Sequence, residues 1–289
     1  MDILYKNDCV ILDSPQDFEP AHIFDCGQCF RFNRVSECSY IGVAMGRAIE
    51  IEQRDGQIML YTSKEDFDEI WRHFLDLDRD YGAIKSALGE GDEIMRGAIS
   101  CGEGIRILNQ DLWETIVSFI ISASNNIPRI KGIIERLCEA FGSRIEYRGR
   151  IYYSFPDAET INSLSLRDLA VIRAGFRDKY IKAAAEAVVS GALSLDALRS
   201  MPTPEAKKAL MSVKGIGNKV SDCILLFGLG RADSFPVDVW IKRIMEFFYF
   251  DGEQPIKTIS EFADKKFGTL GGYAQQYLFF YARENKIGA

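Results

Sequence analysis

The feature that most constrains this chain is a change in the spacing of its apolar residues near position 65. Before that position, short apolar runs are separated by turn signals, whereas after it apolar residues recur at helical spacing. Asp55-Gly56 lies between two alternating runs and is a strong hairpin signal, and short connections favour an antiparallel sheet. The pattern therefore predicts strands at residues 9–13, 29–35, 39–44, 47–53 and 57–62.

The rest of the chain is predicted to be helical. Asp111 and Asn126 are typical N-cap residues, and each precedes apolar positions that form one buried stripe. A third amphipathic stretch covers residues 178–189. We therefore predict an α+β protein in which an antiparallel sheet domain, residues 1–105, precedes an all-helical region, residues 106–289.

Charge differs between these two parts of the chain. Residues 1–105 carry 10 basic and 21 acidic side chains, whereas residues 106–289 carry 25 and 21. Positive charge clusters at residues 129–150 and 173–182. Because attraction to phosphate is local and screened by salt, an acidic protein can carry a nucleic-acid-binding face there. The alternative is that these residues are ordinary solvated helix faces.

Composition excludes several classes of protein. With 47% hydrophobic and 27% charged residues, the chain is neither disordered nor collagen-like. No apolar run is long enough to cross a membrane, and the acidic N-terminus does not have the pattern of a signal peptide. Seven cysteines are too few for a disulfide scaffold, so we expect reduced thiols in a cytoplasmic protein, or a nuclear one in a eukaryote, that is not secreted.

Residues 204–229 are predicted to form two helices joined by the tight turn Gly215-Ile216-Gly217. The two glycines permit backbone angles that side chains disfavour, and they leave amide groups bare at a helix N-terminus, where an anion is stabilised. Asn218 is expected to cap the second helix. The pattern is typical of a helix-hairpin-helix that holds DNA phosphate, but a plain turn without a ligand fits it as well.

Two side chains near this hairpin are suited to chemistry. Lys219 lies in the first turn of the second helix, where the helix dipole favours a neutral amine, which is a nucleophile. The simpler interpretation is a lysine that binds phosphate or water. Asp238 precedes an apolar helical run and is a natural N-cap, a role compatible with stabilising positive charge on a sugar.

Taken together, these segments resemble the helix-hairpin-helix (HhH-GPD) DNA glycosylase superfamily and, within it, the 8-oxoguanine DNA glycosylase/AP lyases. The resemblance implies that the sheet is a TATA-box-binding-protein-like (TBP-like) domain, and that the helical region has two subdomains with the active cleft between them. It is carried by Gly27-Gln-Cys-Phe-Arg31, by Ser118 to Arg129, by Gly175-Phe-Arg177, by Lys214 to Lys219 with Phe235-Pro-Val-Asp238, and by Gly272 to Phe279.

The resemblance implies a bifunctional enzyme that flips 8-oxoguanine out of duplex DNA, forms a lysine Schiff base and cleaves the strand by β-elimination. Lys219 matches the nucleophile and Asp238 the acid that stabilises the transition state. The base pocket would consist of Cys223 and Phe279 on the two faces of the base, Gln275 on its Watson–Crick edge, and the carbonyl of Gly27 on N7–H. That proton is present on 8-oxoguanine and absent from guanine.

The same resemblance implies contacts to DNA from Asn125, Arg129, Phe176 and Arg177, besides the hairpin glycines Gly215 and Gly217. Phe176 would wedge into the base stack, and the two arginines would bond the orphaned cytosine. Three positions depart from the family pattern: Ser124 replaces a gap-filling Asn, Pro128 a small residue and Trp240 a His. The sequence therefore leaves the opposite-base preference open.

No cofactor is expected. Cys26 and Cys29 have metal-like spacing, but no second pair of ligands completes a zinc site, and no cysteine follows Cys223 to form the C-terminal iron–sulfur cluster of some relatives. The resemblance suggests a monovalent cation held by backbone carbonyls of Met211, Val213 and Ile216. We expect a monomer.

Two other functions stay open. A monofunctional alkylbase glycosylase of the same superfamily would use Asp238 and a water molecule, with no lysine nucleophile. A non-catalytic helix-hairpin-helix module would bind DNA without sequence preference and without chemistry. Lys219 argues against the first, and the pocket residues argue against the second.

Overall fold

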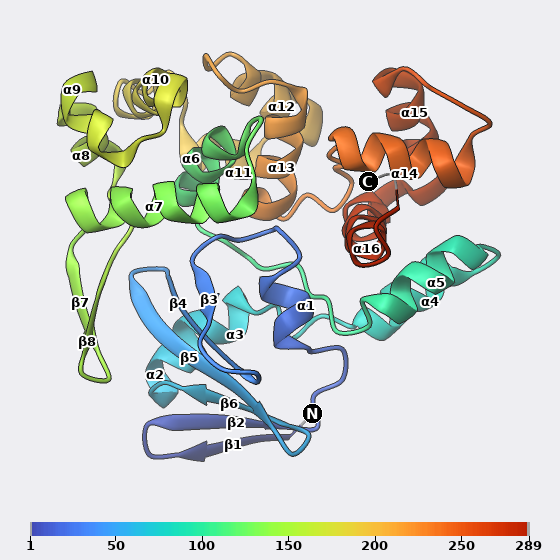
Figure 1. Cartoon of the computed structure of the whole chain (residues 1–289), viewed down its shortest axis with the longest axis horizontal. Coiled ribbons are helices and arrows are strands. Elements are labelled where there is room, and N and C mark those ends of the chain that lie inside the picture. Colours follow the sequence, from blue (N-terminus) through green and yellow to red (C-terminus); the bar gives the residue numbers. More distant parts are fainter. Residues whose placement is uncertain (1, 288–289) are drawn as a thin grey trace.

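Alternating apolar residues build the N-terminal part into one antiparallel sheet. The computed structural model describes residues 2–287, and its six-stranded sheet has the order β1-β2-β6-β5-β4-β3 (Figure 1). Asp55 and Gly56 both have positive φ, 51° and 77°, which confirms the hairpin prediction at this turn. The strands are β1 (Asp2–Lys6), β2 (Cys9–Asp13), β3 (Phe32–Arg34), β4 (Ser39–Ala44), β5 (Arg47–Arg54) and β6 (Gln57–Tyr61).

Strand β1 is the one strand of this sheet that the sequence analysis does not predict. It pairs only with β2 at the edge of the sheet, and nearly all of its side chains are exposed, so no alternation of buried residues marks it. The core of the sheet is closed by short helical segments, whose buried Phe67, Trp71 and Phe74 pack against the strands. These segments are α1 (Pro20–Phe24), α2 (Lys64–Asp66), the π-helical η1 (Phe67–Trp71) and α3 (Arg72–Phe74).

Helices make up most of the remaining chain. The predicted caps are confirmed: Asp111 accepts from Glu114 N at 2.8 Å and Asn126 accepts from Arg129 N at 3.0 Å. The elements are α4 (Tyr81–Gly89), α5 (Glu93–Cys101), α6 (Leu112–Ser122), α7 (Ile127–Phe141), α8 (Ala158–Ser163), α9 (Leu166–Leu169), η2 (Ala170–Ile172), η3 (Gly175–Arg177), α10 (Asp178–Val189), α11 (Leu195–Ser200), α12 (Thr203–Met211), α13 (Asn218–Leu229), α14 (Val239–Tyr249), α15 (Ile256–Phe267), η4 (Gly268–Leu270) and α16 (Gly271–Glu284). No helix within residues 2–287 has the length and hydrophobicity needed to cross a membrane.

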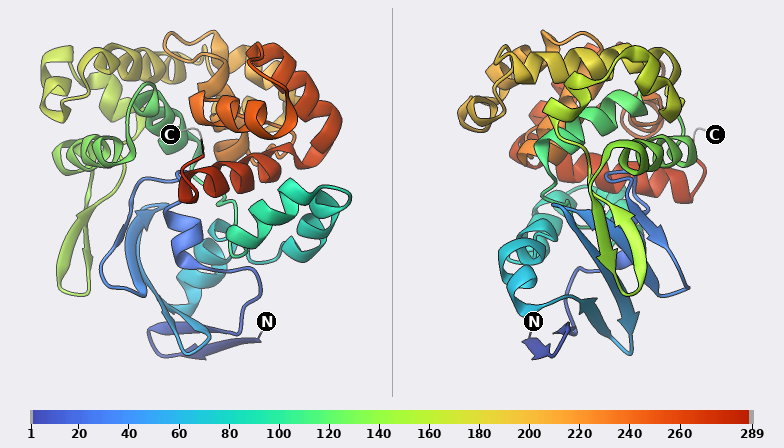
Figure 2. Two further views of the ribbon diagram at one scale, coloured as in Figure 1. Left: turned by 45° about the vertical axis from the view of Figure 1, so that its right-hand side comes forward. Right: turned by 90° about the vertical axis from the view of Figure 1, so that its left-hand side faces the viewer.

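The helical region is interrupted by one hairpin, formed by β7 (Arg144–Tyr147) and β8 (Arg150–Tyr153). It extends from α7 alongside the N-terminal sheet (Figures 1 and 2), where the Tyr147 hydroxyl accepts from Glu50 N at 2.9 Å and donates to Tyr61 O at 2.6 Å. The expectation of an all-helical region is therefore wrong over this stretch. Its sequence signal is the Arg148-Gly149 pair, which has positive φ at both residues, as Asp55-Gly56 does.

Two clusters of buried apolar side chains hold the described residues together. One lies in the sheet domain and the other in the helical region. Helices α4 and α5, which precede position 105, contribute Tyr81, Met95 and Ala98 to the helical cluster. Helix α5 packs against α16, and Tyr81 of α4 lies edge-on to Tyr273 of α16. A division at 105/106 into separate folding units stays a prediction, but the packing already joins these two helices to the second part of the chain.

Candidate active site

A cavity of about 370 Å³ lies where segments from both ends of the chain meet. Its walls come from the loop after α1, from α6 and the start of α7, and from the starts of α13 and α14 and the last turns of α16. Its charged lining residues are two cations, Lys219 and Arg283, and one carboxylate, Asp238. The other lining residues are Gly27, Phe30, Phe119, Ser122, Asn125, Asn126, Ile127, Pro128, Ile130, Trp240 and Phe279.

The predicted turn between α12 and α13 places Lys219 in this cavity. Gly215 has φ of +100°, and a Cβ there would lie 2.5 Å from the ring of Tyr180, so this position requires glycine. Gly217 has φ of −98°, which any residue can adopt, and a Cβ there would meet open space. The expectation that both glycines relieve backbone strain is therefore wrong for Gly217, whose lack of a side chain leaves the adjacent amides accessible.

The start of α13 also differs from the prediction that Asn218 is its cap. Gly217 is the N-cap, and within residues 2–287 no side chain accepts from the first amides of the helix. These amides lack intrahelical partners because they belong to the first turn. The turn therefore presents free N–H groups at the positive end of a twelve-residue helix, which suits an anion.

Lys219 is held by neutral groups. Its Nζ donates to the Ser122 hydroxyl at 3.4 Å and lies 5.3 Å from the centroid of the Phe119 ring. The Ser122 hydroxyl in turn donates to Phe119 O at 2.8 Å. No carboxylate in residues 2–287 forms an ion pair with this amine. The sequence analysis missed Ser122, although it belongs to the quoted segment between Ser118 and Arg129.

Asp238 has the structural role expected for it. Its Oδ1 accepts from Ile241 N at 2.8 Å and so caps α14. The residue lines the cavity together with Lys219, so the capping carboxylate also faces the space that the lysine faces. One side chain is thereby positioned by a helix start and available to stabilise positive charge.

The four predicted base-pocket residues fall into two pairs. Gly27, with φ of +82°, and Phe279 both line the cavity, and a Cβ on Gly27 would lie 3.4 Å from Cε1 of the Phe279 ring. Cys223 and Gln275 are buried, at 3% and 6% exposure, and do not line it. Burial raises the pKa of the Cys223 thiol to about 11, so this sulfur is neutral at neutral pH. Gln275 Oε1 is buried without a hydrogen-bond partner.

The predicted wedge, Phe176, is 55% exposed on η3 and packs edge-on against Tyr180 with 6.1 Å between ring centroids. Arg177 beside it is 2% exposed. Its guanidinium donates to Ala123 O at 2.5 and 3.0 Å, to Ser124 O at 3.0 Å and to Ala174 O at 3.2 Å. Four of its five N–H bonds are therefore directed at backbone. In this structure Arg177 supports the loop at residues 123–124.

The loop before α7 and the first turn of α7 carry the remaining predicted DNA contacts. Asn125 lines the cavity and donates through Nδ2 to Ile121 O at 3.1 Å, and Ser124 has φ of 50°. Arg129 is exposed, and no ion pair or hydrogen bond holds its side chain within the described part of the chain. Of the two predicted arginines, Arg129 alone is presented to solvent.

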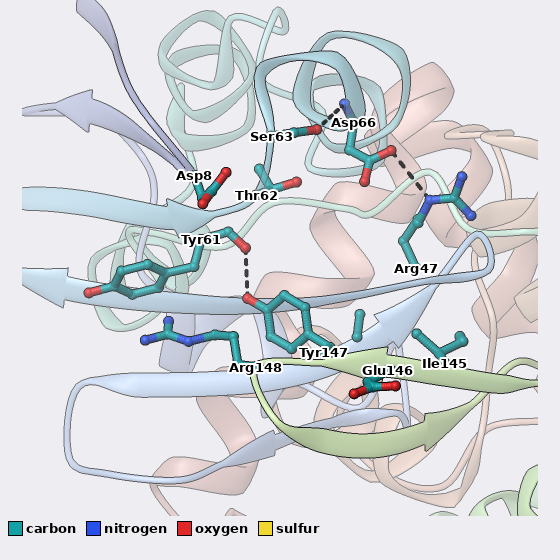
Figure 3. Close-up of a pocket in the computed structure, with 11 residues that line it drawn as sticks. Asp8, Arg47, Tyr61, Thr62, Ser63, Asp66, Ile145, Glu146, Tyr147 and Arg148 are labelled. Atoms are coloured by element: carbon teal, nitrogen blue, oxygen red, sulfur yellow. Dashed lines mark hydrogen bonds and ion pairs between the residues drawn. The ribbon is translucent and has the colours of Figure 1, made fainter.

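A second cavity, of about 510 Å³, lies between the sheet and the β7–β8 hairpin (Figure 3). Its charged side chains are largely paired with protein groups. Arg47 Nε lies 3.3 Å from Asp66 Oδ1, Arg148 Nη1 lies 2.9 Å from Glu50 Oε2, and Tyr147 bonds Tyr61 O. This cavity is formed where Tyr147 and Arg148 of the hairpin bond the sheet.

No three His, Cys, Asp or Glu side chains in residues 2–287 are grouped closely enough to hold a metal ion. All seven cysteines are free thiols. Val213 and Ile216 lie in the turn after α12, where Val213 O accepts from Ile216 N at 3.1 Å. A monovalent cation on the carbonyls of Met211, Val213 and Ile216 stays a prediction.

Two known families match consecutive parts of the chain. The N-terminal domain of 8-oxoguanine DNA glycosylases (OGG_N) matches residues 10–116, and the HhH-GPD superfamily of base excision DNA repair proteins matches residues 117–267. The fold and the family matches define a DNA glycosylase of the helix-hairpin-helix class. This is the class that the hairpin, Lys219 and Asp238 indicate together with the other quoted segments.

Solved structures narrow the class further. The 8-oxoguanine glycosylase/lyase of Clostridium acetobutylicum, in complex with double-stranded DNA containing cytosine opposite 8-oxoguanine, is 41% identical with a TM-score of 0.96 over 99% of both chains. MBOgg1, solved with a low-affinity DNA ligand, is 45% identical with a TM-score of 0.95 over 99% of both chains. The N-glycosylase/DNA lyase of Saccharomyces cerevisiae is 38% identical over 157 residues, which are 49% of this chain and 41% of the yeast protein. The chain belongs to the 8-oxoguanine glycosylase/lyases of the HhH-GPD superfamily, which confirms the predicted family and fold.

Proposed function

We propose that this protein excises 8-oxoguanine from duplex DNA and then cleaves the strand at the resulting site. The observation that carries the proposal is that Lys219 and Asp238, at the starts of two helices, line one cavity with Gly27 and Phe279. The relatives named above are glycosylase/lyases, and two of them were solved with DNA. The roles of the individual residues below are inferred from the geometry and from the family resemblance.

Lys219 supplies the nucleophile. Its unprotonated amine attacks C1′, the bond between C1′ and N9 breaks, and the base leaves after N9 takes a proton from solvent. The amine then loses a proton, O4′ gains one as the sugar ring opens, and a protonated Schiff base joins Nζ to C1′. Removal of a proton from C2′ expels the 3′ phosphate and cleaves the strand. Asp238 stabilises the positive charge that develops on the sugar as the base departs.

Access to C1′ requires the nucleotide to leave the helix, at a cost of a few kcal/mol. Phe176 is exposed enough to fill part of the vacated stack, and the free amides at the start of α13 hold phosphate beside Gly217. Asn125, on the loop before α7, and Arg129, in the first turn of α7, would face the gap. Arg177 acts by holding that loop, so Arg129 is the arginine that meets the opposite base.

The pocket residues divide recognition of the base among them. The carbonyl of Gly27 accepts from N7–H of 8-oxoguanine, and an acceptor facing the N7 lone pair of guanine costs about 1–3 kcal/mol. Gln275, whose Oε1 has no partner, bonds the Watson–Crick edge. Phe279 and the neutral thiol of Cys223 contact the two faces of the ring. Because a Cβ at Gly27 would lie only 3.4 Å from Phe279 Cε1, we expect the Phe279 ring to move away from Gly27 when the base enters.

Borohydride trapping tests this function. A duplex with 8-oxoguanine opposite cytosine is incubated with the protein and borohydride, and covalent complexes are counted on a denaturing gel. We expect trapping by the wild-type protein, and tight binding without trapping or cleavage by Lys219→Gln. Excision without a trapped complex would support the monofunctional alternative. Binding without excision would support the non-catalytic one. The monomeric state and the cytoplasmic or nuclear location stay predictions.

A further inference from the structure

One charged side chain in the active-site cavity takes no part in the chemistry above. Arg283 lines the cavity, and its side chain is 31% exposed. Within the described residues, its ion pair is with the adjacent Glu284, at 3.6 Å between Nη2 and Oε1, and exposed pairs of this kind contribute little. Its guanidinium carbon lies 5.9 Å from the Phe280 ring, a contact that uses no N–H. The guanidinium therefore retains free donors in the cavity.

The position of Arg283 on α16 relates it to the base pocket. Gln275, Phe279 and Arg283 are spaced four residues apart and so share one helix face. Eight residues of helix rise about 12 Å, which is of the order of a nucleotide measured from base edge to phosphate. Exposure increases along this line from 6% at Gln275 to 31% at Arg283. Gln275 therefore lies buried behind the cavity lining, and Arg283 lies at the rim of the cavity.

Charge indicates what the rim would bind. The cavity holds two cations, Lys219 and Arg283, against the single carboxylate of Asp238. The base of 8-oxoguanine is neutral, whereas each phosphate of the backbone is negative. A guanidinium matches phosphate with two parallel N–H bonds, and these charge-assisted bonds are about twice as strong as neutral ones. Trp240, also in the lining, brings no charge of its own.

We propose that Arg283 binds a backbone phosphate next to the flipped nucleotide and so fixes the sugar over Lys219. This inference rests on the proposed function, because only a flipped nucleotide brings its phosphates to the rim. Arg283 is a binding residue in this scheme and breaks no bond. Arg283 binds DNA in which a nucleotide has been flipped out, whereas the hairpin amides bind duplex DNA whether or not it is damaged.

The test starts from the trapping assay, since failure of the wild-type protein to trap would defeat the proposed function and not this inference. Affinities are then measured in the Lys219→Gln background for three duplexes, which carry 8-oxoguanine, a tetrahydrofuran abasic analogue or no damage. We expect Arg283→Gln to weaken binding of the first two about tenfold and of the third less than about twofold. The slope of log K against log salt should fall by about 0.9 for the first two.

Two controls sharpen the experiment. Glu284→Gln removes the neighbouring charge without changing the cavity lining and should leave all three affinities within about twofold. Arg283→Lys should restore part of the loss, because the charge returns without the paired N–H groups. A methylphosphonate placed in turn at each phosphate flanking the lesion should weaken binding at one position, and Arg283→Gln should abolish that effect.

Each other outcome overturns the proposal. A loss for 8-oxoguanine that spares the abasic analogue would mean that Arg283 contacts the base. An equal loss for undamaged duplex would make it part of the general DNA-binding surface. Unchanged affinity, with an unchanged melting temperature of the variant protein, would leave Arg283 without a role in binding.

Discussion

Two cavities of this protein differ in size and in what their polar groups do. The larger one, about 510 Å³ between the sheet and the β7–β8 hairpin, is lined by Arg47 and Arg148, which are paired with carboxylates. The smaller one, about 370 Å³, contains Lys219 and Arg283. Within residues 2–287, Lys219 forms no ion pair, and Arg283 forms only an exposed one with Glu284. The arginines of the larger cavity thus bond other protein groups, whereas Lys219 and Arg283 keep donors that a ligand could use.

This difference has an energetic meaning. A buried polar atom without a partner costs about 1–3 kcal/mol, and Gln275 Oε1 is such an atom. In the larger cavity the Tyr147 hydroxyl both accepts and donates, so the same kind of group stabilises the fold. Variants of the two cavities should therefore separate function from stability.

The largest effect is expected at Asp238. An asparagine side chain can also accept from Ile241 N, so Asp238→Asn should keep the cap. Its free energy of unfolding should lie within about 0.5 kcal/mol of the wild-type value. Loss of the negative charge should slow excision by about 100–1000-fold. Asp80→Asn is the matched control, because Asp80 caps α4 away from the cavity. Single-turnover excision and denaturant unfolding measure the two quantities, and excision within fivefold of wild type would show that the carboxylate acts only as a cap.

Glu114 tests the comparison between the two cavities, because this residue is a buried carboxyl outside the active-site cavity. Burial raises the pKa of Glu114 from its ordinary value of 4.5 to about 7, opposed by Arg31 and reinforced by Asp111 and Glu135. The folded state thus binds the proton more tightly than the unfolded state. Stability contributed by the protonated form is present below about pH 4.5 and is lost as pH rises through 7, by up to about 3 kcal/mol.

Glu114→Gln should therefore gain stability over the wild type as pH rises from 5 to 8, with excision unchanged. Urea unfolding at several pH values measures this gain. A stability difference that is constant across the range would mean that Glu114 is charged or neutral equally in both states.

Adjacent glutamines on α16 give a paired test. Gln276 Nε2 donates to Cys26 O at 2.9 Å, so Gln276→Ala should destabilise the fold by about 1–3 kcal/mol. Gln275→Ala removes an atom without a partner, so its stability should not fall, while its preference for 8-oxoguanine over an abasic analogue should drop about tenfold. Thermal unfolding measures the stability of each variant, and competition binding measures its preference for 8-oxoguanine over the abasic analogue. Equal destabilisation would place Gln275 among the structural residues.

The smallest effects belong to the larger cavity. Tyr147→Phe loses both bonds of the hydroxyl and should cost about 1–2 kcal/mol of unfolding free energy without changing excision. Arg47→Gln breaks a half-exposed pair and should cost less than about 1 kcal/mol. A loss of excision greater than about tenfold in a stably folded Tyr147→Phe would assign this cavity a function that its paired charges do not suggest.

Local signals allowed most of the fold and the helix-start positions of Lys219 and Asp238 to be predicted from sequence, whereas the roles proposed for these two residues came from the family resemblance. Asp111, Asn126 and Asp238 are caps by residue type and by the apolar run that follows, and Lys219 follows the glycine turn. The edge strand β1 carries no buried alternation, so it was missed.

Tertiary contacts account for what the sequence did not predict. Arg177 looked like a DNA contact, and only the fold shows its guanidinium on the carbonyls of residues 123–124. Ser122 and Arg283 line the site because of how their helices pack. The four-residue spacing of Gln275, Phe279 and Arg283 on one helix was a sequence signal that could have identified Arg283. Gly27 and Phe279 came from the family resemblance alone, since no local rule pairs residues so far apart.

The bond from Gln276 to Cys26 joins residues 250 positions apart, and it holds the two facing walls of the base pocket together. At about 5–20 residues per second, a ribosome makes these walls roughly 12–50 s apart. Throughout that interval the growing polypeptide has no complete pocket, even after Lys219 and the hairpin have been synthesised. A chain that ends before residue 275 therefore lacks this bond and the helix face that carries Gln275 and Phe279.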